Sequence, residues 1–198
     1  MSLRRIAAFT LILALLAGAG YAYTRLRTHL PKAIGGKRPT FTPAEDTLLH
    51  DRPLPAGLMV DSIVAQKAKR LLIVYSRKRP IKAYRVALGD APVGHKHFEG
   101  DEKTPEGLYH IDGKNPHSQA HKSLGISYPN AADKAYAARH GQPPGGLVKI
   151  HGIWNGQGHI GKAHLLDDWT NGCIAITDEE IDELYDRVKV GIPVLILP

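Results

Sequence analysis

The sequence predicts a mostly β domain with two short-to-medium helices, arranged as a sandwich or barrel and preceded by an N-terminal apolar helix. Three observations lead to this fold class. Short segments with a β-type pattern follow one another from residue 58 to the C-terminus, only two segments among them are helical in pattern, and an uncharged apolar run opens the chain. With 198 residues, the chain is long enough for one domain with a full core and an additional segment.

Residues 1–23 have the pattern of an export signal. Arg4 and Arg5 precede an uncharged, largely apolar stretch that continues to Tyr23. A charged start followed by an apolar stretch is typical of secretory signals, and the small residues 17–19 offer a cleavage site. The stretch also approaches the length that spans a bilayer. We therefore predict a bacterial cell-envelope protein in the periplasm, either released by signal cleavage or anchored to the inner membrane through this segment.

Residues 24–57 are predicted to form a linker. Basic residues keep this stretch solvated, and prolines interrupt it repeatedly (Pro31, Pro39, Pro43, Pro53 and Pro55). The basic residues could also rest against anionic lipid headgroups, which would favour an anchored form. The domain organisation that follows is a signal or anchor over 1–23, a basic linker over 24–57 and a folded domain over 58–198.

The strands of the domain are predicted from hydrophobic periodicity. Residues 59–65 and 81–88 alternate, and residues 71–75 form a continuous apolar run of the kind found in buried strands. The turn at residues 77–80 indicates that the second and third of these segments form an antiparallel pair. Further strands are predicted at residues 107–111, 124–128, 147–153, 173–176 and 193–197.

Two helices are predicted between the strands. Residues 131–139 form a short alanine-rich segment. Residues 178–190 carry clearer signals, because Thr177 and Glu180 have the spacing of a capping box and Gly191 can end the helix. One face of this helix is apolar, with side chains at helical spacing (Ile181, Leu184, Tyr185 and Val188).

Cys173 is the only cysteine of the chain. It cannot form an intramolecular disulfide, so in an exported protein it is a candidate for a thiol kept for chemistry. The alternative is a buried cysteine that packs as a small apolar residue. Strand periodicity favours the first interpretation, because Ile174 would point inward and turn Cys173 to the other face, as Ile150 does for His151. An imidazole that takes the thiol proton would give a nucleophilic thiolate in an ion pair.

The glycines beside these two residues indicate a shaped site. Gly152 and Gly172 allow close backbone approach and unusual dihedral angles. A turn at Asn171 and Gly172 can aim successive N–H groups at one point, as the oxyanion formed by attack on a carbonyl requires.

The motifs around these residues resemble the signature of the YkuD-type L,D-transpeptidases. His151-Gly152 is followed after seventeen residues by Thr170-Asn171-Gly172-Cys173, similar to the family's His-Gly, loop, Ser/Thr-His/Asn-Gly-Cys pattern. Residues 103–109 (Lys-Thr-Pro-Glu-Gly-Leu-Tyr) resemble its Thr-Pro-x-Gly-aromatic segment. The likeness covers about residues 58–198. It is nearest to the YafK-like branch, which includes an amidase that releases a lipoprotein from peptidoglycan.

The resemblance implies a mostly β catalytic fold and a role for each matched residue. Cys173 would attack the carbonyl at the L-centre of diaminopimelate in a peptidoglycan stem peptide and form a thioester, with His151 as proton donor and acceptor. The backbone N–H groups of Gly172 and Cys173, helped by Asn171, would hold the oxyanion. An amine would then take the acyl group; hydrolysis that releases a diaminopimelate-linked protein or peptide is the alternative, and an inactive wall-binding module a third.

Substrate contacts are less clearly marked. Asp168, Trp169 and Thr170 are candidates for the wall of the substrate pocket, as is Gly152, although Asp168 and Trp169 could equally form a structural loop corner. Many family members have an arginine two residues after the cysteine, where this chain has Ala175. This departure removes a charge from the face of the nucleophile and affects how the stem peptide and the acceptor would be recognised.

Other function classes find little support. The net charge of +7 suits an anionic partner such as a cell-wall polymer, but no stacking aromatics accompany the basic residues and no nucleic-acid partner is predicted. Glycines 156, 158 and 161 match a dinucleotide-loop pattern without a following helix, and are expected to shape a loop over the cleft instead. The histidines are scattered over loops, so no metal and no organic cofactor is predicted.

Overall fold

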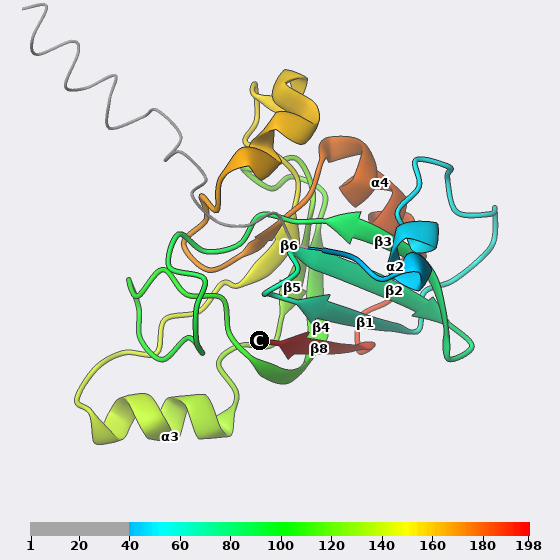
Figure 1. The fold of residues 1–198 in the computed structure, drawn as a ribbon. Coiled ribbons are helices and arrows are strands. Elements are labelled where there is room, and N and C mark those ends of the chain that lie inside the picture. Colours follow the sequence, from blue (N-terminus) through cyan, green and yellow to red (C-terminus); the bar gives the residue numbers. More distant parts are fainter. Residues whose placement is uncertain (1–39) are drawn as a thin grey trace, which may run out of the picture. The chain divides into compact units, whose positions relative to one another are not determined.

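The computed structural model describes residues 40–198. The predicted signal or anchor helix and the first part of the predicted linker lie outside these residues. The described part is built on an eight-stranded sheet in the order β3-β2-β1-β8-β4-β5-β6-β7, with helices at its periphery (Figure 1). None of the helices within residues 40–198 has the length and apolar character that a bilayer crossing requires.

One half of the sheet is a meander with an inserted C-terminal strand. Strands β1 (Ser62–Gln66), β2 (Leu71–Ser76) and β3 (Arg79–Arg85) are antiparallel neighbours, as predicted. The β2–β3 turn contains two residues with positive φ, at positions 77 and 78, which suits the twist of a hairpin. Strand β8 (Pro193–Leu197) pairs in parallel with β1 on the other side.

The other half carries the residues of the predicted site. Strand β4 (Gly107–Asn115) pairs with both β8 and β5 (Ser123–Ile126) and so connects the two halves. Strand β6 (Lys149–His151) follows β5 antiparallel, and the two-residue strand β7 (Ile174–Ala175) runs parallel to β6. The predicted strands at 147–153 and 173–176 therefore exist but are shorter than expected.

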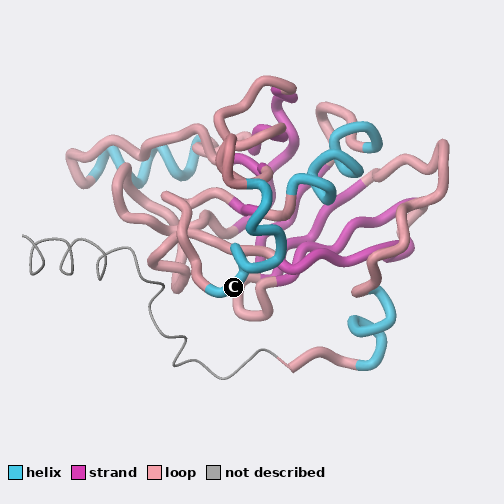
Figure 2. The backbone as a smooth tube through the Cα atoms, turned by 90° about the horizontal axis from the view of Figure 1, so that it is seen from above, coloured by secondary structure: helices cyan, strands magenta, loops and turns pink. Residues whose placement is uncertain are grey.

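The sheet curls into a half-barrel, and the chain beyond β3 returns to its far edge. Ala87 and Ala175 form an antiparallel bridge with two hydrogen bonds, of 3.0 and 2.8 Å. A second bridge joins Gly89 to Thr170. The segment after β3 thus supports β7 from the side opposite to β6. The mostly β prediction is confirmed, and Figure 2 shows the strands in the centre of the domain with helices around them.

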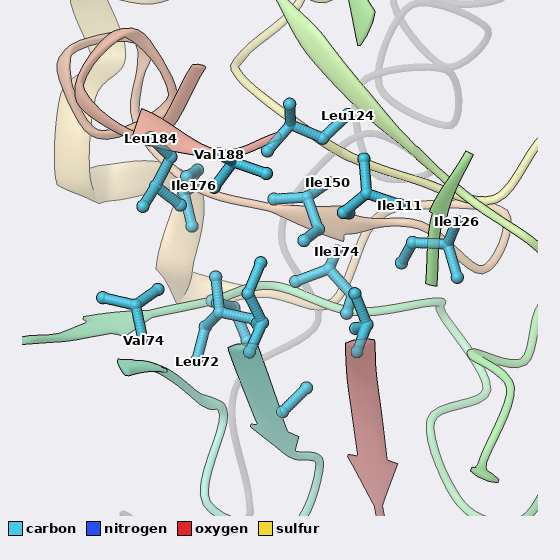
Figure 3. Packing of buried hydrophobic residues seen from close by; sticks show 14 of the residues in the cluster. Leu72, Val74, Ile111, Leu124, Ile126, Ile150, Ile174, Ile176, Leu184 and Val188 are labelled. Atoms are coloured by element: carbon cyan, nitrogen blue, oxygen red, sulfur yellow. The ribbon is translucent and has the colours of Figure 1, made fainter. Parts of the chain in front are cut away.

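The main core lies between the two halves of the sheet and one helix. Leu72 and Val74 of β2 lie in the same cluster as Ile150 of β6 and Ile174 of β7 (Figure 3). Ile150 and Ile174 are fully buried. Because both ends of the curled sheet contribute to one core, the short strands β6 and β7 are held by packing as well as by backbone hydrogen bonds.

The two predicted helices are present. Helix α3 (Ala131–Arg139) has the expected bounds. Helix α4 (Asp178–Arg187) begins with the predicted capping box, in which the Thr177 side chain accepts from the backbone of Glu180. It ends earlier than expected, because Val188 is already extended and bridges to the chain before β1. Ile181 and Leu184 of α4 are fully buried in the core.

Two segments differ from the sequence expectation. Residues 43–48 of the predicted linker form a helix, α2 (Pro43–Leu48), because Pro43 lies at its first position, where proline is tolerated. Its end packs on the small cluster around Leu71, and Leu54 lies in the main core. The glycine-rich loop is also partly helical: residues Gly158–Leu166 form the 3-10 helix η1, with a non-helical residue at Gly161.

Candidate active site

His151 is the last residue of β6, and Cys173 directly precedes the neighbouring strand β7. Their strands are in parallel register, with Ile150 opposite Ile174 and His151 opposite Ala175. Ile150 and Ile174 point into the core, so the alternation of side chains places His151 and Cys173 together on the other face. The predicted separation of the reactive face from the isoleucine face is therefore observed.

The His151 imidazole is buried and oriented by the main chain. Its side chain is 6% exposed, and Nδ1 lies 2.6 Å from the carbonyl oxygen of Gly152. A carbonyl can only accept, so Nδ1 carries the proton and Nε2 has the free lone pair of a general base. The carbonyl that orients the imidazole is therefore that of the next residue, Gly152.

Position 152 leaves no room for a side chain. A Cβ atom there would lie 2.5 Å from the Asp178 carboxylate and 3.0 Å from the Cβ of His121. The same carboxylate accepts a hydrogen bond of 2.8 Å from the N–H of Ile153. The first turn of α4 therefore packs directly against the backbone that holds the imidazole, which explains the glycine after His151.

The Cys173 thiol is partly accessible and its pKa is raised. Sγ lies 3.7 Å from the carbonyl oxygen of Leu147. Burial raises the pKa of the thiol, against the opposing effects of the Lys149 main chain and of the charges of Lys149 and Lys96. Burial also lowers the pKa of the His151 imidazole. Both shifts favour neutral forms, so the thiolate–imidazolium pair expected from the sequence is not the form favoured by these surroundings.

Thr170 organises the turn that presents Cys173. Its hydroxyl donates to the carbonyl oxygen of Cys173 at 2.8 Å and accepts from the N–H of Gly172 at 3.1 Å. Gly172 has φ of +119°, and a Cβ atom there would lie 2.4 Å from the carbonyl oxygen of Lys103. The N–H of Gly172 is thus engaged within the turn, and the N–H of Cys173 becomes the main candidate for an oxyanion donor. Asn171 is exposed beside it.

Of the predicted substrate-pocket residues, Asp168 fixes a loop and Trp169 lies beside the His151 imidazole. The Asp168 carboxylate binds Arg70 at 2.7 Å and accepts from the N–H of Leu88 at 2.9 Å, so it fixes the loop to the chain beyond β3. The Trp169 ring is T-shaped against His151, at 5.7 Å between centroids. Trp154, 46% exposed, lies 6.1 Å from Trp169. The two indoles form an aromatic wall beside the imidazole.

Two residues near the site were not identified from the sequence. His164 of η1 is 5% exposed, and neither ring nitrogen has a hydrogen-bond partner among the described residues. Burial and the nearby His151 lower its pKa to about 4. Lys149 acts electrostatically on both Cys173 and His151. Strand alternation already places Lys149 on the face of His151, two positions before it, but the sequence assigned it no role in the site.

The Thr-Pro-x-Gly segment forms a support beside the turn. Lys67 is 2% exposed and its ammonium donates to the carbonyl oxygens of Gly94 and Thr104, at 2.6 and 2.8 Å, and to Glu106 at 2.7 Å. The Thr104 hydroxyl in turn accepts from the N–H of Gly89. These contacts fix residues 94–106, whose backbone lies against Gly172.

A pocket of about 470 Å³ between η1, α4 and residues 50–53 does not include the thiol or the imidazole.

Comparisons with known proteins identify the family of the chain. The family model described as the L,D-transpeptidase catalytic domain (YkuD) matches residues 60–196. The protein named "Putative L,D-transpeptidase YafK" from Escherichia coli K12 is 31% identical over 110 residues, which are 54% of this chain and 37% of that protein.

Solved structures agree in fold. The helical cell shape determining protein Pgp2 from Campylobacter jejuni has 26% identity and a TM-score of 0.54, over 69% of this chain and 47% of its own. Bd1075 from Bdellovibrio bacteriovorus has 24% identity and a TM-score of 0.50, over 73% of this chain and 50% of its own. The chain therefore spans half or less of the length of these relatives.

Proposed function

The chain belongs to the YkuD family of L,D-transpeptidase catalytic domains, whose model covers residues 60–196, and we propose that it is a cysteine acyltransferase acting on peptidoglycan stem peptides. One observation carries the proposal. The only thiol of the chain shares a sheet face with a buried imidazole whose Nδ1 proton is fixed by a carbonyl. This arrangement provides a nucleophile and a general base with a defined tautomer.

The first half-reaction forms the thioester. The Cys173 sulfur attacks the carbonyl carbon at the L-centre of diaminopimelate while Nε2 of His151 takes the thiol proton. The N–H of Cys173 donates to the oxyanion of the tetrahedral intermediate. When the intermediate collapses, the carbon–nitrogen bond breaks and the imidazolium gives its proton to the departing amine of the terminal D-alanine. The acyl group then remains on sulfur.

The second half-reaction restores the thiol. An acceptor amine attacks the thioester carbonyl, His151 removes a proton from the amine nitrogen, and the carbon–sulfur bond breaks. The imidazolium returns the proton to sulfur, so the site ends in its neutral resting form. Because burial disfavours both charged forms at rest, proton transfer accompanies bond formation in each half-reaction rather than preceding it.

Hydrolysis is the alternative outcome of the same thioester. Water would replace the amine in the second half-reaction, and a diaminopimelate-linked protein or peptide would leave in the first. Every step at Cys173 and His151 is otherwise unchanged. An inactive wall-binding module would use neither residue. The three alternatives therefore differ in whether the thioester forms and in which nucleophile removes it.

Two experiments separate these alternatives. Mass spectrometry after incubation with a carbapenem should find a covalent adduct on Cys173, and none in the Cys173→Ala variant. An unmodified wild-type protein that is folded would support the inactive module. Purified muropeptides, supplied with and without an amine acceptor, then divide the activities: a new amide product requires transfer, whereas acceptor-independent loss of the terminal residue indicates hydrolysis.

The cellular setting follows from the substrate. Peptidoglycan stem peptides lie in the cell envelope, so we place the enzyme in the periplasm, with residues 1–23 as a cleaved signal or an inner-membrane anchor. The part of the predicted linker (24–57) that precedes α2 would be the tether. A peptidoglycan-linked lipoprotein is the partner in the hydrolytic alternative. A role in cell shape is proposed by likeness to Pgp2, a helical cell shape determining protein. Fractionation of cells that express the full chain would test the placement.

A further inference from the structure

A lysine that forms no ion pair within residues 40–198 lies directly beside the nucleophile. Ile150 and Ile174 are opposite each other in the parallel register of β6 and β7. One residue earlier in the same register, Lys149 lies opposite Cys173. Side chains opposite each other in a parallel pair point to the same face, so Lys149 shares the face of the thiol and of His151.

The charge of Lys149 reaches both reactive groups and is not neutralised nearby. It disfavours the imidazolium form of His151 and favours the thiolate form of Cys173. Lys149 is half-buried, and no carboxylate of the described residues pairs with it. An ammonium that is partly removed from water and lacks a counter-ion is unfavourable, and an anionic ligand would relieve this cost.

The other lysine near the thiol is already occupied. Lys96 is 3% exposed, and its ammonium binds the Asp101 carboxylate at 2.7 Å and the carbonyl oxygen of Phe98 at 3.0 Å. Two residues after the nucleophile, Ala175 is fully buried and carries no charge. Of the lysines that act on the thiol, Lys149 is therefore the one available to an incoming anion.

The proposed acyl donor carries an anion at the matching place. A stem peptide whose terminal D-alanine is the leaving residue ends in a carboxylate, separated from the attacked carbonyl carbon by the amide nitrogen and one α-carbon. Adjacent strands lie about 4.8 Å apart. The backbones of Lys149 and Cys173 are therefore about one strand spacing apart, and the lysine side chain extends from the same face as the thiol that meets the carbonyl.

We propose that the Lys149 ammonium binds the terminal carboxylate of the leaving residue, so that the site selects peptides that end one residue beyond the attacked carbonyl. This inference rests on the proposed function. During acylation the sulfur–carbon bond forms, the carbon–nitrogen bond breaks and His151 protonates the departing amine. The free amino acid then leaves with its carboxylate unchanged.

The test compares three donors of the same disaccharide tetrapeptide. The first has a free terminal carboxylate, the second is amidated at that carboxylate, and the third is amidated only at the side-chain carboxylate of diaminopimelate. We expect the wild type to prefer the first donor over the second by about 10- to 100-fold in kcat/KM, the range given by a hydrogen bond between two charged groups. Lys149→Met should lose this preference, and Lys149→Arg should keep most of it.

The controls separate the outcomes. Lys189→Met removes an exposed lysine that follows α4 and should retain the wild-type preference. A wild type inactive on all donors would overturn the proposed function itself, whereas an active wild type that treats the first two donors alike overturns only this inference. The inference also fails if Lys149→Met lowers all three donors equally, which would indicate an effect on the thiol. If the wild type disfavours the third donor and Lys149→Met does not, the lysine binds the side-chain carboxylate of diaminopimelate instead. That result would also overturn the inference.

Alkylation of Cys173 gives a measurement that does not need a muropeptide. Iodoacetate carries a carboxylate and iodoacetamide does not, so the ratio of their rates reports an anion-binding group near the sulfur. We expect Lys149→Met to lower both rates, because the Lys149 charge favours the thiolate, and to lower the rate with iodoacetate severalfold more, so that the ratio falls. An equal change in both rates, which leaves the ratio unchanged, contradicts a role in carboxylate binding.

Discussion

Removal of the Thr170 hydroxyl should loosen the turn that presents the nucleophile. This hydroxyl is buried and joins two backbone groups, the N–H of Gly172 at 3.1 Å and the carbonyl oxygen of Cys173 at 2.8 Å. Valine has nearly the same shape as threonine but cannot form either hydrogen bond. Thr170→Val therefore leaves one donor and one acceptor without a protein partner while creating little empty space.

The magnitude follows from the cost of those two unpaired groups. A buried polar group without a partner costs about 1 to 3 kcal/mol. Since the turn borders the accessible site, we take the lower half of that range for each group and expect a loss of about 2 to 4 kcal/mol in the free energy of unfolding. The backbone of Cys173 also loses its fixed position, so the rate of acylation by a carbapenem should fall by about 10-fold or more.

Urea denaturation followed by circular dichroism measures the first effect, and mass spectrometry of the Cys173 adduct over time measures the second. Thr170→Ser is the matched control, because it keeps the hydroxyl and removes only a methyl group. It should remain within about 1.5 kcal/mol of the wild type in stability. A Thr170→Val protein with wild-type stability and acylation rate would show that the hydroxyl does not hold the turn.

Three further changes test other parts of the site. Gly152→Ala should lower both the melting temperature and the rate of acylation, because its Cβ would meet the Asp178 carboxylate at 2.5 Å; a variant with unchanged kinetics would contradict the fit described for this position. His164, with a pKa near 4 in the fold and about 6.5 when unfolded, binds protons more strongly in the unfolded chain, so stability should be fully present above pH 6.5 and fall by roughly 2 to 3 kcal/mol as the pH drops towards 4. His164→Phe should flatten that part of the stability–pH curve, and an unchanged slope would assign it to other groups. Lys67→Met should lower the free energy of unfolding in urea by about 3 kcal/mol, because it leaves Glu106 and two carbonyl oxygens unpaired. A loss well under about 1 kcal/mol would contradict the stabilising role of Lys67.

Local signals in the sequence were sufficient for much of the fold. The bounds of α3 and of β8 are those predicted, and the capping box of α4 begins the helix where Thr177 and Glu180 indicated. Alternation around Ile150 and Ile174 also predicted that His151 and Cys173 share one face, as they do. Each of these signals depends on residues a few positions apart, which is the range over which capping and periodicity act.

The remaining features depend on contacts that are distant in sequence. Helix α2 forms where prolines indicated a linker, since one proline sits at a tolerated position and nearby apolar residues reach the sheet. Asp168 forms an ion pair with Arg70, which lies 98 positions away in the sequence. The raised pKa of the Cys173 thiol likewise reflects burial by the folded chain. No local pattern encodes these pairings, so the sequence predicted that Cys173 and His151 share a face but not the electrostatic state of the two groups.

The placement of the two reactive residues depends on the register of very short strands. A slip of one residue between β6 and β7 would exchange the two faces of a strand, turning Cys173 into the core and Ile174 towards the substrate. Burial of Ile150 and Ile174 opposes this slip, and the two hydrogen bonds between Ala87 and Ala175 oppose it from the other edge. The apolar packing that stabilises the curled sheet thus also sets the spacing of thiol, imidazole and lysine. Substitutions that shrink Ile150 or Ile174 should consequently reduce acylation before they abolish folding, because a loosened register displaces the nucleophile while most of the core remains.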